Sequence, residues 1–216
     1  MVRWRAVLAA LAGVAVLAVV PATSATAASP AKRCTAKGAK TVAQNRYARL
    51  FTTPGRIDET GALYPEGDET GRLYGCMLSV GKRMLLAVAA DDRYVRYQWF
   101  DHVRLNRRFV AWQFNSYDVS CKGGCEPGYN PTQHSVLARD LRAPRSWEFR
   151  GAVKGDSLVL GRRGTPAWLQ DATGGAVEVH AGTNVLDSGA VDSLALDVAT
   201  LSWANAGVPK SEPLDP

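Results

Sequence analysis

The sequence predicts an all-β fold, and two observations carry this prediction. Short runs of alternating apolar and polar residues, bounded by Gly, Asn and Asp, recur along the chain, and alternation with period two is typical of strands with one buried face. Beyond residue 28, no stretch keeps apolar residues at the i, i+3, i+4, i+7 spacing of an amphipathic helix over three turns. The composition, with 46% hydrophobic and 21% charged residues, excludes a disordered or collagen-like chain.

The N-terminal segment predicts export. Two cations, Arg3 and Arg5, precede an uninterrupted apolar run over 6–20, which is shorter than a membrane-spanning helix needs. Small residues follow, and Ala25-Thr26-Ala27 supplies the small-x-small pattern of a signal-peptidase site. We therefore expect a signal peptide over 1–28 and an extracellular, secreted protein with no membrane span after cleavage. An uncleaved membrane anchor is the alternative.

Four cysteines lie beyond that segment, and an even number of thiols in an oxidising compartment predicts disulfides. Three connectivities are open. The two glycines between Cys121 and Cys125 favour a small closed loop there, which leaves Cys34 to pair with Cys76. That second bridge would contribute roughly 4 kcal/mol in the chain-entropy model. A zinc site is the competing interpretation, but the C-x3-C segment has no nearby second cysteine pair and no spaced histidines.

A recurring hairpin gives the fold prediction more detail. Three segments, at 102–112, 157–168 and 193–203, combine an apolar strand, a short turn and a second strand that ends in Trp. A degenerate copy lies at 41–50, and two more strands fit between consecutive hairpins. The repeating unit is therefore four antiparallel strands, which is the composition of a propeller blade. We expect an incomplete or small β-propeller-like array of four-stranded antiparallel blades.

The motifs that close these strands resemble those of secreted bacterial TolB-like propeller proteins. Val110-Ala111-Trp112 and Pro166-Ala167-Trp168 are similar to a strand pair that closes in V-A-W, and Arg139-Asp140-Leu141-Arg142 is similar to an outer strand that closes in V-R-D-L. The resemblance covers roughly residues 40–205 and implies a fold rather than an activity. Only about three blades and one hairpin are present, whereas closed propellers have four to eight blades. The ring is then incomplete or completed by a partner, or the sheets pack as an irregular sandwich.

Domain boundaries follow from this arrangement. We expect a mature N-terminal segment over 29–39, the propeller-like domain over 40–206, and a disordered tail over 207–216. Long insertions between the second and third strands of two blades, at Thr52–Arg72 and Asn115–Gln133, are predicted surface loops. Pro166 cannot donate a ladder hydrogen bond, so we expect it at a strand start or an edge.

The two ends of the strands are predicted to differ in charge. Connections in a four-stranded antiparallel meander alternate between the two ends of the sheet. We call the end with the first–second and third–fourth connections the turn end, and the opposite end the loop end. The turn end carries Asp197 and nine cations. These cations are Arg46, Lys82, Arg83, Arg107, Arg108, Arg142, Arg145, Arg162 and Arg163. Such an end can dock on an anionic cell-wall polymer or lipid headgroups, whereas the alternative is that the arginines only keep the domain soluble.

The loop end is predicted to be acidic and rich in aromatic residues. Its aromatic residues are Tyr64, Tyr94, Tyr97, Trp99, Tyr117 and Tyr129. Rings beside carboxylates suit a sugar or a peptide, and the alternative is that the rings pack the loops onto the sheets. Its clustered acids are Asp58, Glu59, Glu66, Asp68 and Glu69. They lack the D-x-D-x-D-G spacing of a calcium loop.

Signals for catalysis are weak, so no catalytic, cofactor-binding or metal-binding residue is predicted. His102, His134 and His180 occur singly, and the chain has no G-x-S-x-G nucleophile elbow. Asp101 and His102 are neighbours in a predicted strand, so their side chains should point to opposite faces. The sequence therefore predicts a secreted binding or interaction module of β-propeller type, with an unidentified ligand.

The alternative function is an extracellular hydrolase or lyase that uses carboxylates on the loop end. The expected partners are an anionic cell-wall polymer or a protein, with no nucleic acid. A homo-oligomer is a further option, because an incomplete ring could be completed by a second copy.

Overall fold

A computed structural model describes residue 29 and residues 33–53, 56–57, 63–64, 71–92, 96–118 and 130–215. The predicted signal peptide and the predicted Cys121–Cys125 bridge lie outside the described residues. The all-β prediction is confirmed, and all strand pairings in the described residues are antiparallel. No helix in the described part of the chain has the length and apolarity needed to cross a membrane.

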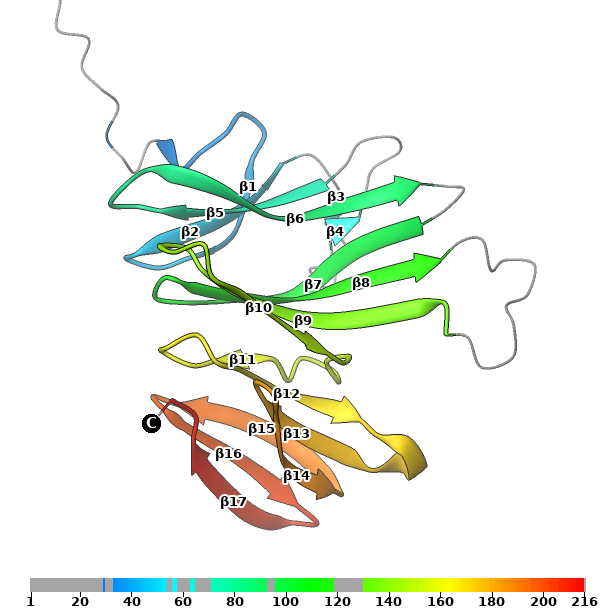
Figure 1. The fold of residues 1–216 in the computed structure, drawn as a ribbon. Coiled ribbons are helices and arrows are strands. Elements are labelled where there is room, and N and C mark those ends of the chain that lie inside the picture. Colours follow the sequence, from blue (N-terminus) through cyan, green and yellow to red (C-terminus); the bar gives the residue numbers. More distant parts are fainter. Residues whose placement is uncertain are drawn as a thin grey trace, which may run out of the picture.

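The main strands form four successive meanders, which we name sheets 1 to 4 (Figure 1). Sheet 1 consists of β1 (Lys40–Gln44), β2 (Ala48–Thr53), β5 (Gly71–Met77) and β6 (Lys82–Asp92). Sheet 2 consists of β7 (Arg96–Asn106), β8 (Phe109–Asp118), β9 (Thr132–Asp140) and β10 (Ser146–Arg150). Sheet 3 consists of β11 (Val159–Leu160), β12 (Pro166–Asp171), β13 (Val177–Ala181) and β14 (Asn184–Gly189). Sheet 4 consists of β15 (Val191–Asp197), β16 (Thr200–Asn205) and β17 (Val208–Pro213).

Sheets 1 and 2 share one hydrogen-bonded ladder through β6. This strand pairs with β5 up to Ala89 and with β7 from Ala90 onward. The short strands β3 (Arg56–Ile57) and β4 (Leu63–Tyr64) pair with each other, and β4 also pairs with β7. A short 3-10 helix, Thr173–Gly175, connects β12 to β13. The four sheets follow one another along the molecule without closing into a ring in the described residues (Figure 1).

Several predicted boundaries change. Three predicted strands do not end at Trp, since β8, β12 and β16 all continue beyond it. Both predicted insertions are shorter than expected, because Gly71–Arg72 belongs to β5 and Asn115–Asp118 to β8. Pro166 is the first residue of β12, which confirms its predicted place at a strand start and is where a missing amide does least harm.

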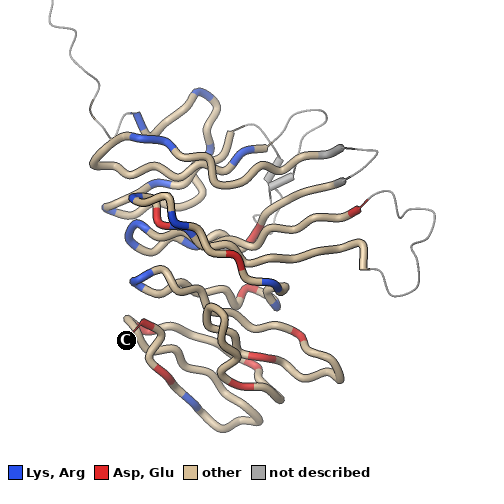
Figure 2. Tube along the Cα trace, in the orientation of Figure 1, with Lys and Arg blue, Asp and Glu red and all other residues tan. Residues whose placement is uncertain are grey.

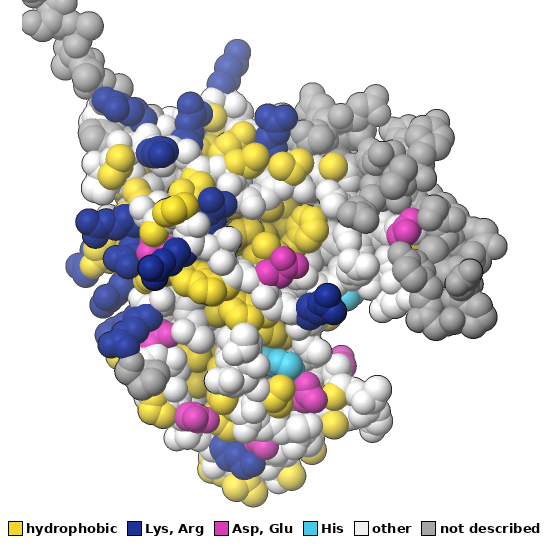
Figure 3. Space-filling model, viewed as in Figure 1, with side chains coloured by type: hydrophobic (Ala, Val, Ile, Leu, Met, Phe, Trp, Pro, Cys, Tyr) yellow, Lys and Arg dark blue, Asp and Glu magenta, His cyan; other side chains and the backbone are white. Residues whose placement is uncertain are grey.

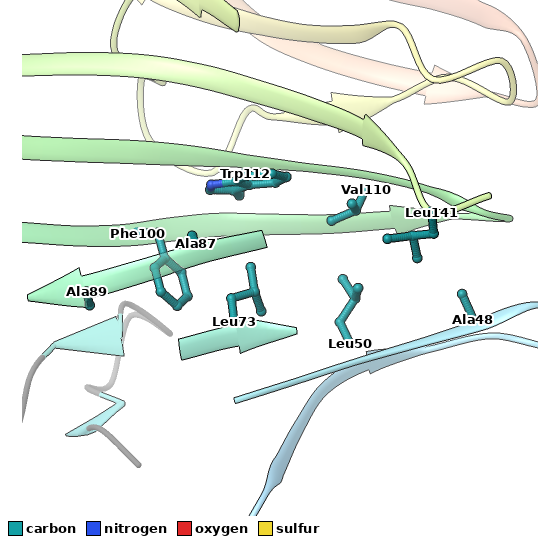
Figure 4. Packing of buried hydrophobic residues seen from close by; sticks show 9 residues of the cluster. All are labelled: Ala48, Leu50, Leu73, Ala87, Ala89, Phe100, Val110, Trp112 and Leu141. Atoms are coloured by element: carbon teal, nitrogen blue, oxygen red, sulfur yellow. The ribbon is translucent and has the colours of Figure 1, made fainter. Parts of the chain in front are cut away.

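One hydrophobic cluster lies between each pair of successive sheets, and each contains a tryptophan. Trp112 of sheet 2 packs with Leu50 and Leu73 of sheet 1 (Figure 4). Trp168 of sheet 3 packs in the cluster with sheet 2, and Trp203 of sheet 4 packs in the cluster with sheet 3. All three indoles are at least 94% buried. Aromatic rings contribute the largest area to such cores, so these residues hold neighbouring sheets face to face.

The first strands of the four sheets contact one another in order, β1 with β7, β7 with β11, and β11 with β15. Side chains of β7 form hydrogen bonds to backbone carbonyls in, and directly before, the first strand of the next sheet. Arg104 Nε donates to the carbonyl of Leu158 (2.8 Å), and Asn106 Nδ2 donates to that of Leu160 (2.8 Å). These polar side chains thus fix the position of sheet 3 relative to sheet 2, while the apolar cluster between the two sheets holds the sheets together.

The N-terminal segment covers the outer face of sheet 1. The predicted Cys34–Cys76 disulfide is confirmed, with both cysteines fully buried. The cluster around it includes Phe51 and Tyr74, whose rings stack with centroids 5.4 Å apart. The bridge ties residues before β1 to the middle of the sheet, and closing a loop of this length stabilises the fold by about 4 kcal/mol in the chain-entropy model.

The prediction of a disordered tail over 207–216 is wrong. Residues 208–213 form β17, which pairs along its whole length with β16, and Leu214 is 95% buried in the cluster with sheet 3. The polar, proline-containing composition suggested disorder. Pairing with the exposed edge of β16 and burial of Leu214 outweigh that local tendency.

The prolines of β17 sit where the ladder does not need their amides. The amide of Leu214 donates to the carbonyl of Ala199 (2.8 Å), so by alternation the odd-numbered amides of β17 face the open edge. Pro209 and Pro213 have no N–H, which leaves Ser211 as the outward amide of this strand. This edge therefore offers a further strand few donors, as in protected edge strands.

A shortened chain tests the revised role of the C-terminal residues. A variant that ends at Ala206 should lose at least about 2 kcal/mol of unfolding free energy, because it removes a strand and the buried Leu214 side chain. A variant that ends at Leu214 keeps both and should stay within about 1 kcal/mol of the full chain. Urea unfolding measures both, and equal stability of the two variants would restore the disordered-tail interpretation.

Candidate functional site

The turn ends of sheets 1, 2 and 3 together form a groove of about 840 Å³, which we name the turn-end groove. Four turns contribute to its cationic lining: β5–β6, β7–β8, β9–β10 and β11–β12. The cations that line it are Lys82, Arg107, Arg108, Arg142, Arg145, Arg162 and Arg163. Figure 2 shows Lys and Arg positions gathered at this end of the sheets, and Figure 3 shows hydrophobic side chains among them.

The structure therefore brings together seven of the nine cations predicted for the turn end. The other two, Arg46 and Arg83, do not line the groove, and neither does Asp197 of sheet 4. Arg46 instead lies over the ring of Tyr47, 4.7 Å from its centroid.

Hydrogen bonds between turns hold sheets 1 and 2 in register at the groove. The side-chain oxygen of Asn45 accepts the amides of Tyr47 (2.8 Å) and Ala48 (3.0 Å), which shapes the β1–β2 turn. Its Nδ2 atom donates to the carbonyl of Arg107 (2.9 Å) in the β7–β8 turn. The carbonyl of Arg108 accepts the amide of Leu141 in the β9–β10 turn (3.0 Å). The three turns thus form one connected backbone surface.

Two glycines allow the sheets to approach closely at this end. A Cβ atom at Gly75 of sheet 1 would lie 2.4 Å from a Leu141 methyl, so a glycine is needed for Leu141 to seat against β5. Gly164 has φ +97° in the β11–β12 turn, and a Cβ there would lie 2.5 Å from the Phe109 ring. Gly164 therefore meets both a steric and a conformational requirement, and it brings Arg162 and Arg163 beside β8.

Among the described residues, one carboxylate lines the groove, and it already has a cationic partner. Asp140 is buried, pairs with Arg108 Nε at 3.1 Å and accepts the amide of Arg142 at 2.9 Å. Arg108 also lies over the Phe109 ring, 4.8 Å from its centroid. Asp140 thus shapes the turns around the groove and neutralises one of the seven cations.

Most of the remaining cations form no ion pair with another described residue. Within the described residues, five form no ion pair and are exposed to solvent. These five are Lys82, Arg107, Arg142, Arg145 and Arg162. Like charges held close together repel one another, and an anion in the groove would relieve that repulsion. A guanidinium group also binds carboxylate or phosphate through two parallel hydrogen bonds.

Sequence reasoning missed the apolar lining of the groove. Exposed hydrophobic side chains come from two sheets: Tyr47 and Val80 from sheet 1, and Trp147 from sheet 2. Met84 and Leu141 extend this apolar surface. Trp147 lies two residues after Arg145 in the sequence, and this spacing could have indicated an aromatic side chain beside the cations of the groove. The groove therefore offers both flat apolar area and positive charge.

A second polar cluster, also not predicted, lies on sheet 2 toward the loop end. Asn115 is fully buried, and its Oδ1 atom accepts a hydrogen bond from Gln113 Nε2 (2.7 Å). The same oxygen lies 2.6 Å from Nδ1 of His134, which places the ring proton on Nδ1. Asn115 Nδ2 donates to Asp101 Oδ2 (3.1 Å). One amide thus organises three neighbours in the core of the sheet.

Burial shifts the protonation of both ionisable members of this cluster. It raises the pKa of the Asp101 carboxyl, and the charge of His102 together with the Asn115 hydrogen bond offsets part of the rise. It lowers the pKa of His134, and the charge of Asp101 offsets part of that change. Both shifts favour the neutral form, as expected for groups removed from water.

The prediction that Asp101 and His102 point to opposite faces is wrong. The β7–β8 register shifts between Asp101 and Arg104, and His102 has φ +49° within this bulge. A bulge breaks the two-residue alternation of a strand. His102 Nε2 therefore lies 3.9 Å from Asp101 Oδ1, while its Nδ1 lies 3.5 Å from Asp156 Oδ1. Asp156 also pairs with Arg104.

The remaining predicted residues show packing roles or lie outside the described residues. His180 stacks on Trp168 (centroids 5.0 Å apart) and lies 2.8 Å from Glu178. Among the loop-end aromatic residues, Tyr97 pairs across the strands with Tyr117 and contacts Trp99, and all three are half-buried. Tyr94, Tyr129 and the side chain of Tyr64 lie outside the described part. So do the candidate calcium ligands Asp58, Glu59, Glu66, Asp68 and Glu69.

In comparisons with known proteins, no protein-family model, curated protein or solved structure matches this chain.

The buried cluster predicts a pH dependence of stability. Because the pKa of His134 is lowered in the folded protein, the unfolded chain binds a proton first as the pH falls through the ordinary histidine value near ~6.5. The free energy of unfolding should therefore decrease from pH 7.5 to pH 5.5. His134→Gln removes this contribution, so its stability should fall less over that interval. Urea unfolding at both pH values measures this change. If the unfolding free energies of the two proteins fall by the same amount between pH 7.5 and pH 5.5, His134 does not contribute.

Proposed function

We propose that this protein is a secreted binding module that holds an anionic ligand in the turn-end groove. One observation carries the proposal: four turns from three sheets place seven cations around one groove, and the described part of the chain contributes to it a single carboxylate, which is already paired. Solubility depends on the net charge of the whole surface, so it does not require cations to gather in one groove.

The proposed scaffold is an open, β-propeller-like array. The four-stranded meanders, the contacts between their first strands and the tryptophan in each inter-sheet cluster support this proposal. The likeness of the V-A-W and R-D-L-R segments to TolB-like proteins belongs to the same proposal. In such an array every first–second and third–fourth turn lies at one end of the blades, which explains why cations far apart in the sequence share a site.

Secretion is part of the proposal. The apolar segment and small-x-small motif near the N-terminus support it. The buried Cys34–Cys76 bridge fits an oxidising compartment, where structural disulfides persist. An extracellular module with a cationic groove would meet anionic polymers at the cell surface, and its affinity for them would fall as salt screens the charges.

The alternative function, a hydrolase or lyase, has less support. Glycosidic chemistry pairs two carboxylates, one of them with a raised pKa. Asp101 and Asp156 both approach His102, and burial raises the pKa of Asp101. Burial alone would also raise the pKa of Asp156, but hydrogen bonding and the charge of Arg104 lower it overall. Both carboxylates are held by neighbouring side chains, so we prefer binding to catalysis.

Charge-matched variants test the proposed function. Arg107→Gln/Arg145→Gln/Arg162→Gln removes three groove cations that form no ion pair among the described residues, and Lys40→Gln/Arg72→Gln/Arg150→Gln removes three exposed cations that do not line the groove. On immobilised dextran sulfate at 0.1 M salt, the groove variant should bind about tenfold more weakly, at roughly 0.5 kcal/mol for each lost charge contact. The control should change by less than about threefold. Equal losses would mean that only net charge matters, and would contradict the proposal.

A further inference from the structure

We infer that the ligand of the turn-end groove is an acidic polysaccharide, that is, a chain of sugar rings that bear carboxylates. This inference rests on the proposed function and names the class of ligand for the same groove. Three observations carry it: the extent of the cations across the sheets, the exposed aromatic rings among them, and a carboxylate of the chain itself bound at the β11–β12 turn.

The cations are spread too widely for one small anion. Lys82 comes from sheet 1, Arg107 from sheet 2 and Arg162 from sheet 3. Packed sheets lie about 10 Å apart, so the cations extend over roughly 20 Å along the stack. A ligand that neutralises all of them must be extended and must carry anionic groups at intervals. A linear polyanion meets this requirement.

The rings in the groove favour a polymer with apolar faces. Trp147 is 38% exposed and Tyr47 is 37% exposed, and both line the groove. Aromatic rings offer flat apolar area against which the C–H face of a sugar ring can pack. A polyphosphate chain has no such face and would leave the Trp147 ring in water, whereas one face of the Tyr47 ring is already covered by Arg46. Repeating sugar rings with anionic substituents use the rings and the cations together.

The β11–β12 turn, which contributes Arg162 and Arg163 to the groove, already binds a carboxylate of the chain itself. Asp215 Oδ2 accepts the backbone amide of Arg163 in the β11–β12 turn (2.8 Å). The side chain of Asp215 also packs against Gly161, where a Cβ atom would collide with it. The backbone of this turn is therefore compatible with a carboxylate, which is the anionic group of a uronic acid. Because Asp215 occupies the Arg163 amide, a ligand carboxylate would meet the exposed guanidinium group of Arg162. Guanidinium groups bind the same planar group in a two-point geometry.

The test uses isothermal titration calorimetry with three probes of equal charge: a galacturonate oligomer long enough to span the groove, linear polyphosphate and an oligothymidylate. We expect the galacturonate oligomer to bind tightest and free galacturonate to bind at least about a hundredfold more weakly, because one unit reaches the cations of one sheet only. Trp147→Ala should weaken oligomer binding about fivefold and change polyphosphate binding by less than about twofold. Trp147→Phe keeps a ring and should retain most of the affinity.

Val185→Ala is the matched control, because Val185 is exposed on β14 and does not line the groove. Equal binding of the oligomer by wild type and Trp147→Ala would overturn the polysaccharide inference, as would tighter binding of oligothymidylate or equal affinity for free galacturonate. In each of these cases, weaker binding of the polyanions by the Arg107→Gln/Arg145→Gln/Arg162→Gln variant would still support the proposed function. If that variant binds every probe as well as wild type, the proposed function itself fails. Near-ultraviolet circular dichroism identifies any variant that does not fold.

Discussion

The burial of sheet faces against the next sheet is the constraint on which the rest of the structure depends. An antiparallel sheet with two apolar faces needs a neighbour on each side. Here Trp112, Trp168 and Trp203 each fill one space between successive sheets. At one end of the stack the Cys34–Cys76 segment covers sheet 1, and at the other end β17 completes sheet 4 with a proline-protected edge. The chain thus covers the outer face of sheet 1, whereas at sheet 4 β17 protects the edge of the sheet and its own residues stay exposed.

The turn-end groove is a consequence of this stacking. Each turn is short and local, but packed sheets hold consecutive turns side by side, so cations distant in the sequence meet in space. The Asn45 hydrogen bond connects a turn of sheet 1 to sheet 2, the Leu141 amide joins two turns of sheet 2, and the close approach at Gly164 adds sheet 3. The mutual repulsion of these cations opposes folding, and the proposed ligand would offset it by binding to the folded state alone.

Local patterns predicted much of this fold, and tertiary contacts decided the rest. Alternation and turn residues located the hairpins, and cysteine pairing gave the Cys34–Cys76 bridge. The tail was mispredicted because pairing with β16 is non-local, and the bulge at His102 leaves no mark in the alternation of residue types. For the groove, meander topology predicted the cations. The apolar lining of the groove, with Trp147 and Leu141, was not predicted. It depends on which side of sheet 2 each turn faces, and no local sequence pattern shows that side.

The most direct test of the account maps the ligand onto the backbone. In a titration of the isotope-labelled protein with a galacturonate oligomer, amide chemical-shift changes should concentrate in the turns at 78–82, 107–109, 140–147 and 161–164. Residues of the loop end, such as 97–101 and 132–135, and of β17 should change little. Changes centred on the loop end, or spread evenly over the surface, would contradict the claim that stacking of the first three sheets builds the binding site.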